Sequence, residues 1–253
     1  MLPRTTKKET TQRVKIPICG KGSQSCRLCH SFEAGIFSNL SEKSLKFLEQ
    51  CKTSNHYKRK QIIFYEGNPV VGLYCIQSGK VKLYKTSDDG KQQILKIAQG
   101  GDILGHSSLF TDTPHIATAE VIEESDICFL DKNRFLSVLQ ANPSIALRLL
   151  GQLSRELNRS EEQVLDFAYK SVRVRFVEFL LALKQNFGVY EQGAYRLQIA
   201  LSREELAQAI GTTVETVVRL LSEFRAEGLV EVEKKSISIK EPEKLLTFTE
   251  ASY

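Results

Sequence analysis

LSREELAQAIGTTVETVVRLL, residues 201–221, is the stretch of this 253-residue chain that decides its fold. Ser202, followed three residues later by Glu205, forms a capping box and predicts a helix that begins at about Arg203. Gly211 then predicts a turn, and either Thr212 or Thr213 can cap a second helix. Two short helices joined in this way predict a helix-turn-helix, a motif that places its second helix in the major groove of DNA.

The second helix has one face suited to reading bases. Leu206, Ile210, Val217 and Leu220 are expected in the core that the two helices share. Arg219 can donate two parallel hydrogen bonds to guanine and Glu215 can accept one from cytosine, with about 1–3 kcal/mol of discrimination for a good bidentate pair. A surface ion pair between Glu215 and Arg219 is the competing interpretation. The residues expected to contact DNA are Ser202, Arg203, Thr212, Thr213, Val214, Glu215, Val218 and Arg219. Residues 228–232 and 236–239 predict a two-stranded wing.

The charge distribution does not by itself indicate DNA binding. Of the net charge of +5, the excess lies in residues 1–60, which contain 13 Lys and Arg against 4 Asp and Glu, whereas residues 170–253 contain 12 of each. The DNA interface must therefore depend on geometry. The basic N-terminus is either a solvated arm or a counter-charge for nearby negative groups. Neither a signal peptide nor an apolar run of about 18 residues occurs, so we expect a cytoplasmic protein without a membrane partner.

Residues 61–130 have the pattern of an antiparallel β-domain. Short apolar runs alternate with turns, and Asp89-Gly90 is a strong hairpin signal between two of them. Gly79 and Gly100-Gly101 supply further turns, at a spacing typical of a small barrel or roll. The expected strands are Ile62–Tyr65, Gly72–Ile76, Val81–Lys85, Gln93–Ile97, Ala117–Val121 and Ile127–Leu130.

A long helix is predicted after Asn142-Pro143. Apolar and small residues recur there every three or four positions in a narrow, heptad-like stripe. The helix could pack on its own domain, but so narrow and long a stripe favours a partner helix in a parallel homodimer. The expected dimer interface is Ala146, Leu150, Leu153, Leu157, Ser160, Val164 and Phe167. A further helix is expected over Val172–Gln185, and a loop with a short strand over Gly188–Leu201.

Three of the six cysteines, Cys19, Cys26 and Cys29, lie within eleven residues of a loop rich in Gly and Ser. Such a loop can wrap thiolates around one metal or iron–sulfur centre. A fourth thiolate would come from Cys51, Cys75 or Cys128, although Cys75 lies on an apolar strand and reads as a core residue. Zinc usually pairs two short cysteine spacings, and only one is present. A thiol–disulfide switch and inert thiols are the remaining interpretations.

A β-roll, a long dimer helix and a winged helix-turn-helix, in this order, resemble the CRP/FNR family of bacterial regulators over roughly residues 30–245. The resemblance implies an α+β fold with a cyclic-nucleotide-binding-like β-roll, a dimerisation helix and a C-terminal winged helix-turn-helix. The implied domains are residues 1–30, a sensory loop containing cysteines; residues 31–141, the roll; residues 142–169, the dimerisation helix; and residues 170–253, the DNA-binding domain.

Val-Glu-Thr-Val-Val-Arg at residues 214–219 is similar to the fumarate and nitrate reduction branch of this family. The similarity implies a homodimer on a TTGAT-like DNA palindrome, with RNA polymerase as a further partner. That branch usually has a serine where this chain has Val218, so its contact with the outer thymine would differ. The branch also implies a [4Fe–4S] cluster that responds to oxygen or nitric oxide, with Cys19, Cys26, Cys29 and Cys128 as ligands. Here the longer gap between loop cysteines comes first, whereas in that branch it comes second.

Family members that bind cyclic AMP carry Gly-Glu and Arg-Ser-Ala in the roll. Here His106 follows Gly105, and His115-Ile116-Ala117 stands at the second motif. Without the arginine, the cyclic phosphate loses its charge-assisted partner. We therefore do not expect cyclic AMP to bind. Both histidines are expected in loops, with haem ligation as the second interpretation for either.

An enzyme that carries a metal or cluster is the alternative from another functional class. In such an enzyme, residues 201–221 would be an ordinary packed helical hairpin. The sequence contains no nucleophile elbow, no glycine-rich phosphate loop and no His-Glu metal motif. We therefore expect a regulator with no catalytic residues.

Overall fold

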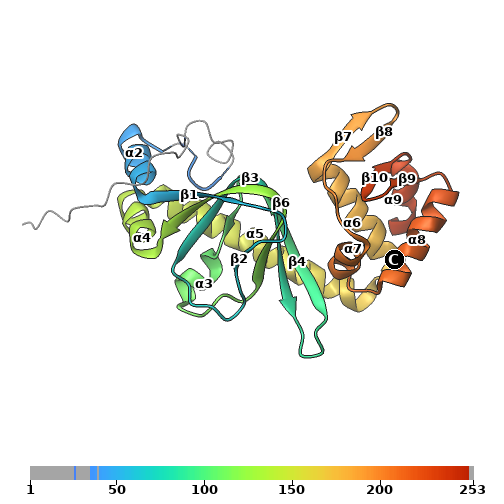
Figure 1. Cartoon of the computed structure of the whole chain (residues 1–253), viewed down its shortest axis with the longest axis horizontal. Helices are drawn as coiled ribbons and strands as arrows, with labels where there is room; N and C mark the ends of the chain where they lie inside the picture. Colours follow the sequence, from blue (N-terminus) through green and yellow to red (C-terminus); the bar gives the residue numbers. More distant parts are fainter. Residues whose placement is uncertain (1–25, 27–34, 39, 251–253) are drawn as a thin grey trace, which may run out of the picture.

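The computed structural model describes residues 26, 35–38 and 40–250. A β-roll and a helical C-terminal domain lie at opposite ends of the molecule, and one long helix connects them (Figure 1). None of the described helices combines the length and the apolar character needed to cross a membrane.

The roll is a six-stranded antiparallel sheet with strand order β1-β6-β3-β4, in which β2 also pairs with β6 and β5 with β3. Its interior is filled by apolar side chains such as Ile76, Val81, Val121 and Ile127, all fully buried. The strands are β1 (Lys52–Tyr57), β2 (Ile62–Phe64), β3 (Gly72–Thr86), β4 (Gln92–Gln99), β5 (Ile103–Leu104) and β6 (Thr118–Asp131).

The predicted strands lie in the roll, but two of the predicted interruptions between strands are wrong. Residues 72–76 and 81–85 belong to the single strand β3, and residues 117–121 and 127–130 fall within or beside the single strand β6. Gly79 adopts a positive φ of 87° where the register between β3 and β6 shifts, and a Cβ there would meet the Glu124 carbonyl oxygen at 2.3 Å. The glycine therefore forms a bulge rather than a turn. The predicted hairpin at Asp89-Gly90 is confirmed between β3 and β4.

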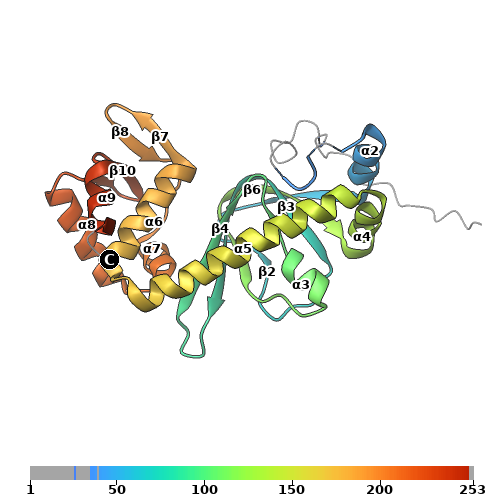
Figure 2. The same ribbon diagram turned by 180° about the vertical axis from the view of Figure 1, so that it is seen from behind.

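Among the described residues, four helices accompany the roll, and the sequence pattern predicted only one of them. The other three are α2 (Glu42–Cys51), α3 (His106–Thr111) and α4 (Lys132–Ala141). The fourth is the predicted long helix, α5 (Pro143–Tyr169), which runs along the roll toward the C-terminal domain (Figure 2). Ile145 and Leu149 of α5 are buried against α2, α4 and the outer face of the sheet.

The C-terminal domain is built around the helix-turn-helix. Its helices are α6 (Val172–Phe187), α7 (Arg203–Ile210), α8 (Val214–Ala226) and α9 (Pro242–Glu250). The predicted wing is β9 (Val230–Glu233) with β10 (Ser236–Ile239), and it joins a four-stranded sheet through β8 (Ala194–Leu197) and β7 (Gly188–Glu191). The region between α6 and α7, expected to hold one short strand, therefore forms a hairpin.

Candidate nucleic-acid interface and cysteine site

Local hydrogen bonds fix the start of α7 and the start of α8. The Ser202 hydroxyl accepts from the Glu205 amide at 3.1 Å, and the Glu205 carboxylate accepts from the Ser202 amide at 2.7 Å. Gly211 ends α7 with a φ of 66°, and the Thr213 hydroxyl accepts from the Thr216 amide at 3.3 Å. The predicted capping box, glycine turn and threonine cap are thus confirmed.

The helix-turn-helix has the core that the sequence predicts. Leu206, Ile210, Val217 and Leu220 are each at most 3% exposed and belong to one apolar cluster. Phe224 extends this cluster and stacks on Phe176 of α6, with ring centroids 5.9 Å apart. The core fixes which side of α8 faces outward.

The outward side of α8 carries the residues expected to read bases. Val214 and Val218 are 38% and 49% exposed, and the Arg219 side chain is 64% exposed. The Arg219 guanidinium donates to the Glu223 carboxylate at 2.8 Å, so its ion pair is with the following turn of α8. Backbone amide and Thr213 hydroxyl hydrogen bonds lower the pKa of Glu215, which therefore stays an ionised acceptor at neutral pH.

The other residues expected to contact DNA lie in different settings. Ser202 is half-buried at the start of α7, and Thr212 is half-buried in the turn. The Arg203 side chain reaches the wing, where it donates to the Lys234 carbonyl oxygen at 3.1 Å. Burial lowers the pKa of Arg203. Arg203 thus links the start of α7 to the wing.

The α5 stripe expected to form the dimer interface is largely exposed in the single chain. Leu150, Leu157 and Val164 are 61%, 60% and 67% exposed. Leu153 is half-buried, and Phe167 packs partly within its own chain, where Arg175 lies 4.7 Å from the ring centroid. Ala146 and Ser160 are also exposed. Such a row of exposed leucine and valine side chains on a regular helix suits a partner helix.

Polar side chains connect the roll to α5 at His106, the residue that follows Gly105. His106 lies in helix α3 and is buried, so the expected loop position is wrong. Its Nε2 atom lies 2.8 Å from Glu156 of α5, and Lys96 of β4 donates to the same carboxylate at 2.9 Å. Burial opposes ionisation of Glu156, but His106 and Lys96 outweigh it and lower the pKa of this carboxyl.

His115 lies in the loop before β6, as expected, but it is buried. Its ring stacks on Phe64 of β2, with centroids 3.8 Å apart. Burial lowers the pKa of His115, so the ring is neutral at pH 7. A neutral ring carries no charge with which to pair with an anion, as an arginine would.

The cysteine site is described in part, because Cys19 and Cys29 lie outside the described residues. Cys26 and Cys128 are both buried, and they lie near enough for the charge of one to affect the other. Burial raises the pKa of the Cys26 thiol, and the adjacent Lys52 ammonium counteracts the rise. The Cys26 amide donates to Glu49 at 2.8 Å. Within the described part of the chain, no group of three or more His, Cys, Asp or Glu residues is placed to hold a metal ion.

The other candidate ligands lie on the same side of the sheet. Cys51 ends α2 and is buried, and Cys75 of β3 is half-buried and directly opposite Cys128 of β6. Cys26 and Cys51 belong to the apolar cluster between the sheet and α2, α4 and α5, and Cys75 packs against it. Cys26 and Cys128 are therefore thiols that one centre could share, and Cys75 is the thiol nearest to Cys128 in register.

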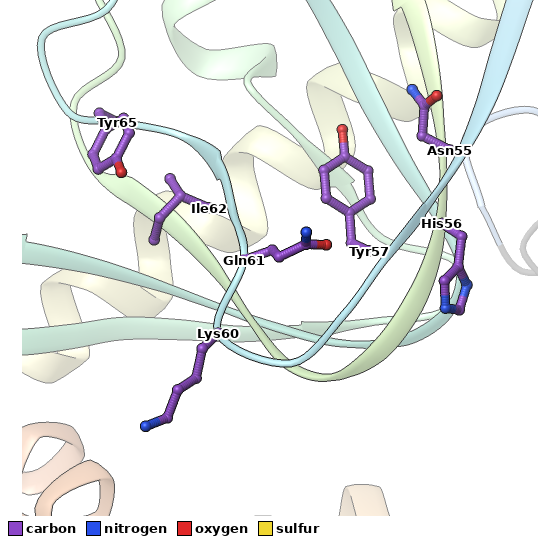
Figure 3. Close-up of a pocket in the computed structure, with 7 residues that line it drawn as sticks. All are labelled: Asn55, His56, Tyr57, Lys60, Gln61, Ile62 and Tyr65. Carbon is purple, nitrogen blue, oxygen red and sulfur yellow. The ribbon is translucent and has the colours of Figure 1, made fainter.

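A surface pocket of about 550 Å³ lies on the roll, at β1, β2 and the turn between them (Figure 3). In Figure 3 the Gln61 side chain extends toward Tyr57, whereas Lys60 points away from the other lining side chains. The pocket is separate from the region of His106 and Glu156. The residues that line it are Asn55, His56, Tyr57, Lys60, Gln61, Ile62 and Tyr65.

Two family profiles match the chain in the order that the fold shows. Residues 54–142 match the cyclic nucleotide-binding domain, and residues 174–248 match the Crp-like helix-turn-helix domain. The first match covers the roll with α3 and α4, and the second covers α6 to α9. Together they define a regulator with an effector-type roll and a DNA-binding domain.

Comparisons with complete proteins give the same result. The chain is 34% identical over 212 residues to the CRP-like cAMP-activated global transcriptional regulator of Mycobacterium tuberculosis, covering 84% of this chain and 95% of that protein. It is 26% identical over 221 residues to the regulatory protein HlyX of Actinobacillus pleuropneumoniae, covering 87% and 92%. The structure of FixK2 from Bradyrhizobium japonicum superimposes with a TM-score of 0.68 and 25% identity, covering 78% and 96%. The chain therefore belongs to the CRP/FNR family of transcription regulators, and its relatives in these comparisons are regulators rather than enzymes.

Proposed function

We propose that this protein binds a TTGAT-like palindrome as a homodimer and regulates transcription. The observation that carries the proposal is the exposed face of α8, where an ionised acceptor, Glu215, and a donor, Arg219, lie one turn apart above a rigid core. Such a pair matches a cytosine and a guanine in the major groove. Val218 supplies apolar contact to a thymine methyl group.

The α5 stripe supports the dimer in this proposal. Two helix-turn-helix units must lie about 34 Å apart to enter successive major grooves on one side of DNA. A parallel pair of α5 helices would set that distance, because α6 follows α5 after only Lys170 and Ser171. RNA polymerase is the second macromolecular partner that we expect for such a regulator.

The DNA proposal is tested by a gel shift on a duplex with two inverted TTGAT half-sites, four base pairs apart. We expect the protein to prefer this duplex to a scrambled one. Arg219→Ala should reduce the preference by about 1–3 kcal/mol for each half-site, because one bidentate contact is lost in each. Arg196→Ala removes an exposed arginine from β8 and serves as the control. An unchanged preference for the palindrome in Arg219→Ala, or equal binding of both duplexes by the wild type, would contradict the proposal.

We further propose a [4Fe–4S] cluster held by Cys19, Cys26, Cys29 and Cys128, which makes DNA binding responsive to oxygen or nitric oxide. The burial of Cys26 and Cys128 in one region supports this ligand set. When bound, the cluster supplies a centre that these gases attack. In the protein itself, Glu49 orients Cys26 through its amide, and the Lys52 ammonium offsets thiolate charge.

The cluster proposal is tested by the absorption spectrum and the iron and sulfide content of protein purified without oxygen. We expect a brown protein whose visible absorption band bleaches in air. Cys26→Ser should remove the band, and Cys75→Ser should retain it. Colourless wild-type protein without iron would overturn the proposal and favour a zinc site or a thiol switch.

We propose that cyclic AMP is not the effector, although the similar mycobacterial regulator is described as cAMP-activated. The carboxylate of Glu156 occupies the side of His106 that faces α5, and neutral His115 replaces the phosphate-binding arginine. Titration calorimetry with cyclic AMP should give no binding heat. Micromolar binding would contradict this part of the proposal.

A further inference from the structure

Four charged side chains meet where the roll touches α7, and we call this group the roll–α7 junction. Lys82 of β3 lies 3.6 Å from Glu205 of α7 and 3.5 Å from Glu120 of β6. Arg59, from the turn between β1 and β2, lies 3.9 Å from Glu205. The Lys82 and Glu205 side chains are only 7% and 11% exposed, so water screens this pair little.

Glu205 also belongs to the capping box of α7, so the junction connects the roll to the start of that helix. The Glu205 carboxylate accepts from the Ser202 amide and closes the capping box at the start of α7. Arg59 donates to the Ala200 carbonyl oxygen at 3.3 Å, in the segment just before that start. Two cations of the roll thus hold the end of α7 that carries Ser202 and Arg203, two of the residues expected to contact DNA.

The roll also contacts the other end of α7. Gln93 of β4 donates to the Ala209 carbonyl oxygen at 3.3 Å, and Gln208 of α7 donates to Gln92 at 3.1 Å. Ile122 of β6 is buried in the apolar cluster of the C-terminal domain. These contacts fix α7 along its length, while Val218 and Arg219 of α8 remain exposed.

We infer that Lys82 is a positioning residue for DNA binding, which acts through Glu205 to hold the helix-turn-helix in one orientation on the roll. The inference rests on the proposed DNA-binding function. Because the junction leaves the reading face of α8 uncovered, it fixes the orientation without blocking DNA. Without it, the domain must be ordered when DNA binds, and that ordering lowers the affinity.

The test measures the affinity of full-length Lys82→Met for the TTGAT palindrome by fluorescence anisotropy over a range of salt concentrations. We expect binding about tenfold weaker than that of the wild type, a typical size for coupling between sites. The slope of the affinity against salt should not change, because Lys82 does not neutralise a phosphate. Lys82→Arg should restore most of the affinity. Lys85→Met is the matched control, since it breaks an exposed ion pair within the roll, with Glu66.

Glu205→Gln completes a double-mutant cycle, because glutamine can retain the capping box but not the charge. Glu205→Gln should weaken binding in the wild type and have little further effect in Lys82→Met. Should Lys82→Met not fold, Arg59→Gln takes its place in the test. Arg59 is more exposed than Lys82, so we expect a smaller loss of DNA affinity. The Glu205 amide should also exchange its hydrogen faster in Lys82→Met, a result that does not require DNA.

Unchanged affinity in Lys82→Met and Arg59→Gln would overturn the inference. Tighter binding would also overturn it, because the junction would then restrain the DNA-binding domain. Additive losses in the cycle, or a shallower salt slope, would show that Lys82 acts independently of Glu205. If wild-type protein shows no preference for the palindrome, the proposed function fails instead, and the hydrogen exchange result still tests the coupling.

Discussion

The two faces of α5 differ in what they contact, although one continuous helix carries both. One face packs on the roll through buried Ile145 and Leu149, and farther along it presents Glu156 to His106 and Lys96. The other face carries the exposed α5 stripe, with Leu150 and Leu157 about 60% exposed. A change in the roll can therefore reach the dimer interface through a single rigid element, which is how we expect the signal to travel.

The largest difference between the two faces should appear in stability. Leu149→Ala removes a side chain that is 3% exposed, and should lower the free energy of unfolding by about 2–5 kcal/mol. Leu147→Ala makes the same change at a position 71% exposed and should cost less than about 0.5 kcal/mol. Urea denaturation measures both. Similar losses for the two variants would contradict the assignment of the faces.

A smaller and pH-dependent effect is expected at Glu156. The folded protein holds the pKa of this carboxyl below its ordinary value, so its ionised form stabilises the fold. Glu156→Gln should lower the free energy of unfolding by about 1–3 kcal/mol at pH 7, as for a charged hydrogen bond. The difference from wild type should persist above the unfolded pKa of about 4.3 and shrink as the pH falls below it.

The control for this pH effect is Glu161→Gln, an exposed position on the same helix. The free energy of unfolding of Glu161→Gln should differ little from that of the wild type from about pH 3 to about pH 7, on both sides of the ordinary pKa of about 4.3. If the difference in free energy of unfolding between Glu156→Gln and wild type stayed constant down to about pH 3, well below the ordinary pKa of about 4.3, the ionised form of Glu156 would not be what stabilises the fold.

The smallest effect on the stability of the single chain is expected on the stripe. Leu157→Glu should change the free energy of unfolding of the monomer by less than about 0.5 kcal/mol, because this side chain is 60% exposed. It should nevertheless dissociate the dimer, since it places two like charges in an apolar seam. Sedimentation velocity measures the association, with Asn158→Glu as the control one residue along. A dimeric Leu157→Glu variant would show that the interface lies elsewhere.

The helix-turn-helix could be predicted closely because its signals are local. The capping box at Ser202 and Glu205, the glycine at the end of α7 and the cap at Thr213 each act over three or four residues. The apolar positions then follow from helical periodicity. The roll was harder, because β3 and β6 pair over about fifty residues of sequence and tolerate bulges that read as turns. The missed helices α2, α3 and α4 are only 10, 6 and 10 residues long, so each offers few turns in which a helical period can be recognised.

In the candidate site, too, features that depend on a short segment were predicted, and contacts between distant residues were not. Glu215 and Arg219 were predicted because α8 alone determines which side chains face outward. The contacts of His106 with Glu156, and of Lys82 with Glu205, were missed, because nothing near either residue in the sequence signals its partner. The capping function of Glu205 was visible in the sequence, and its two cationic neighbours were not.

The sequence by itself determined the identity of the elements at the DNA-binding end, since caps, turns and helical periodicity are properties of short segments. It also determined that thiols cluster near Cys26. Only the tertiary structure decided how these elements act on one another: that Glu205 of α7 is held by Lys82 and Arg59 of the roll, and that α5 separates a packed face from an exposed one. The physical reason is that ion pairs and packing between domains depend on distances in space, which separation along the chain does not fix.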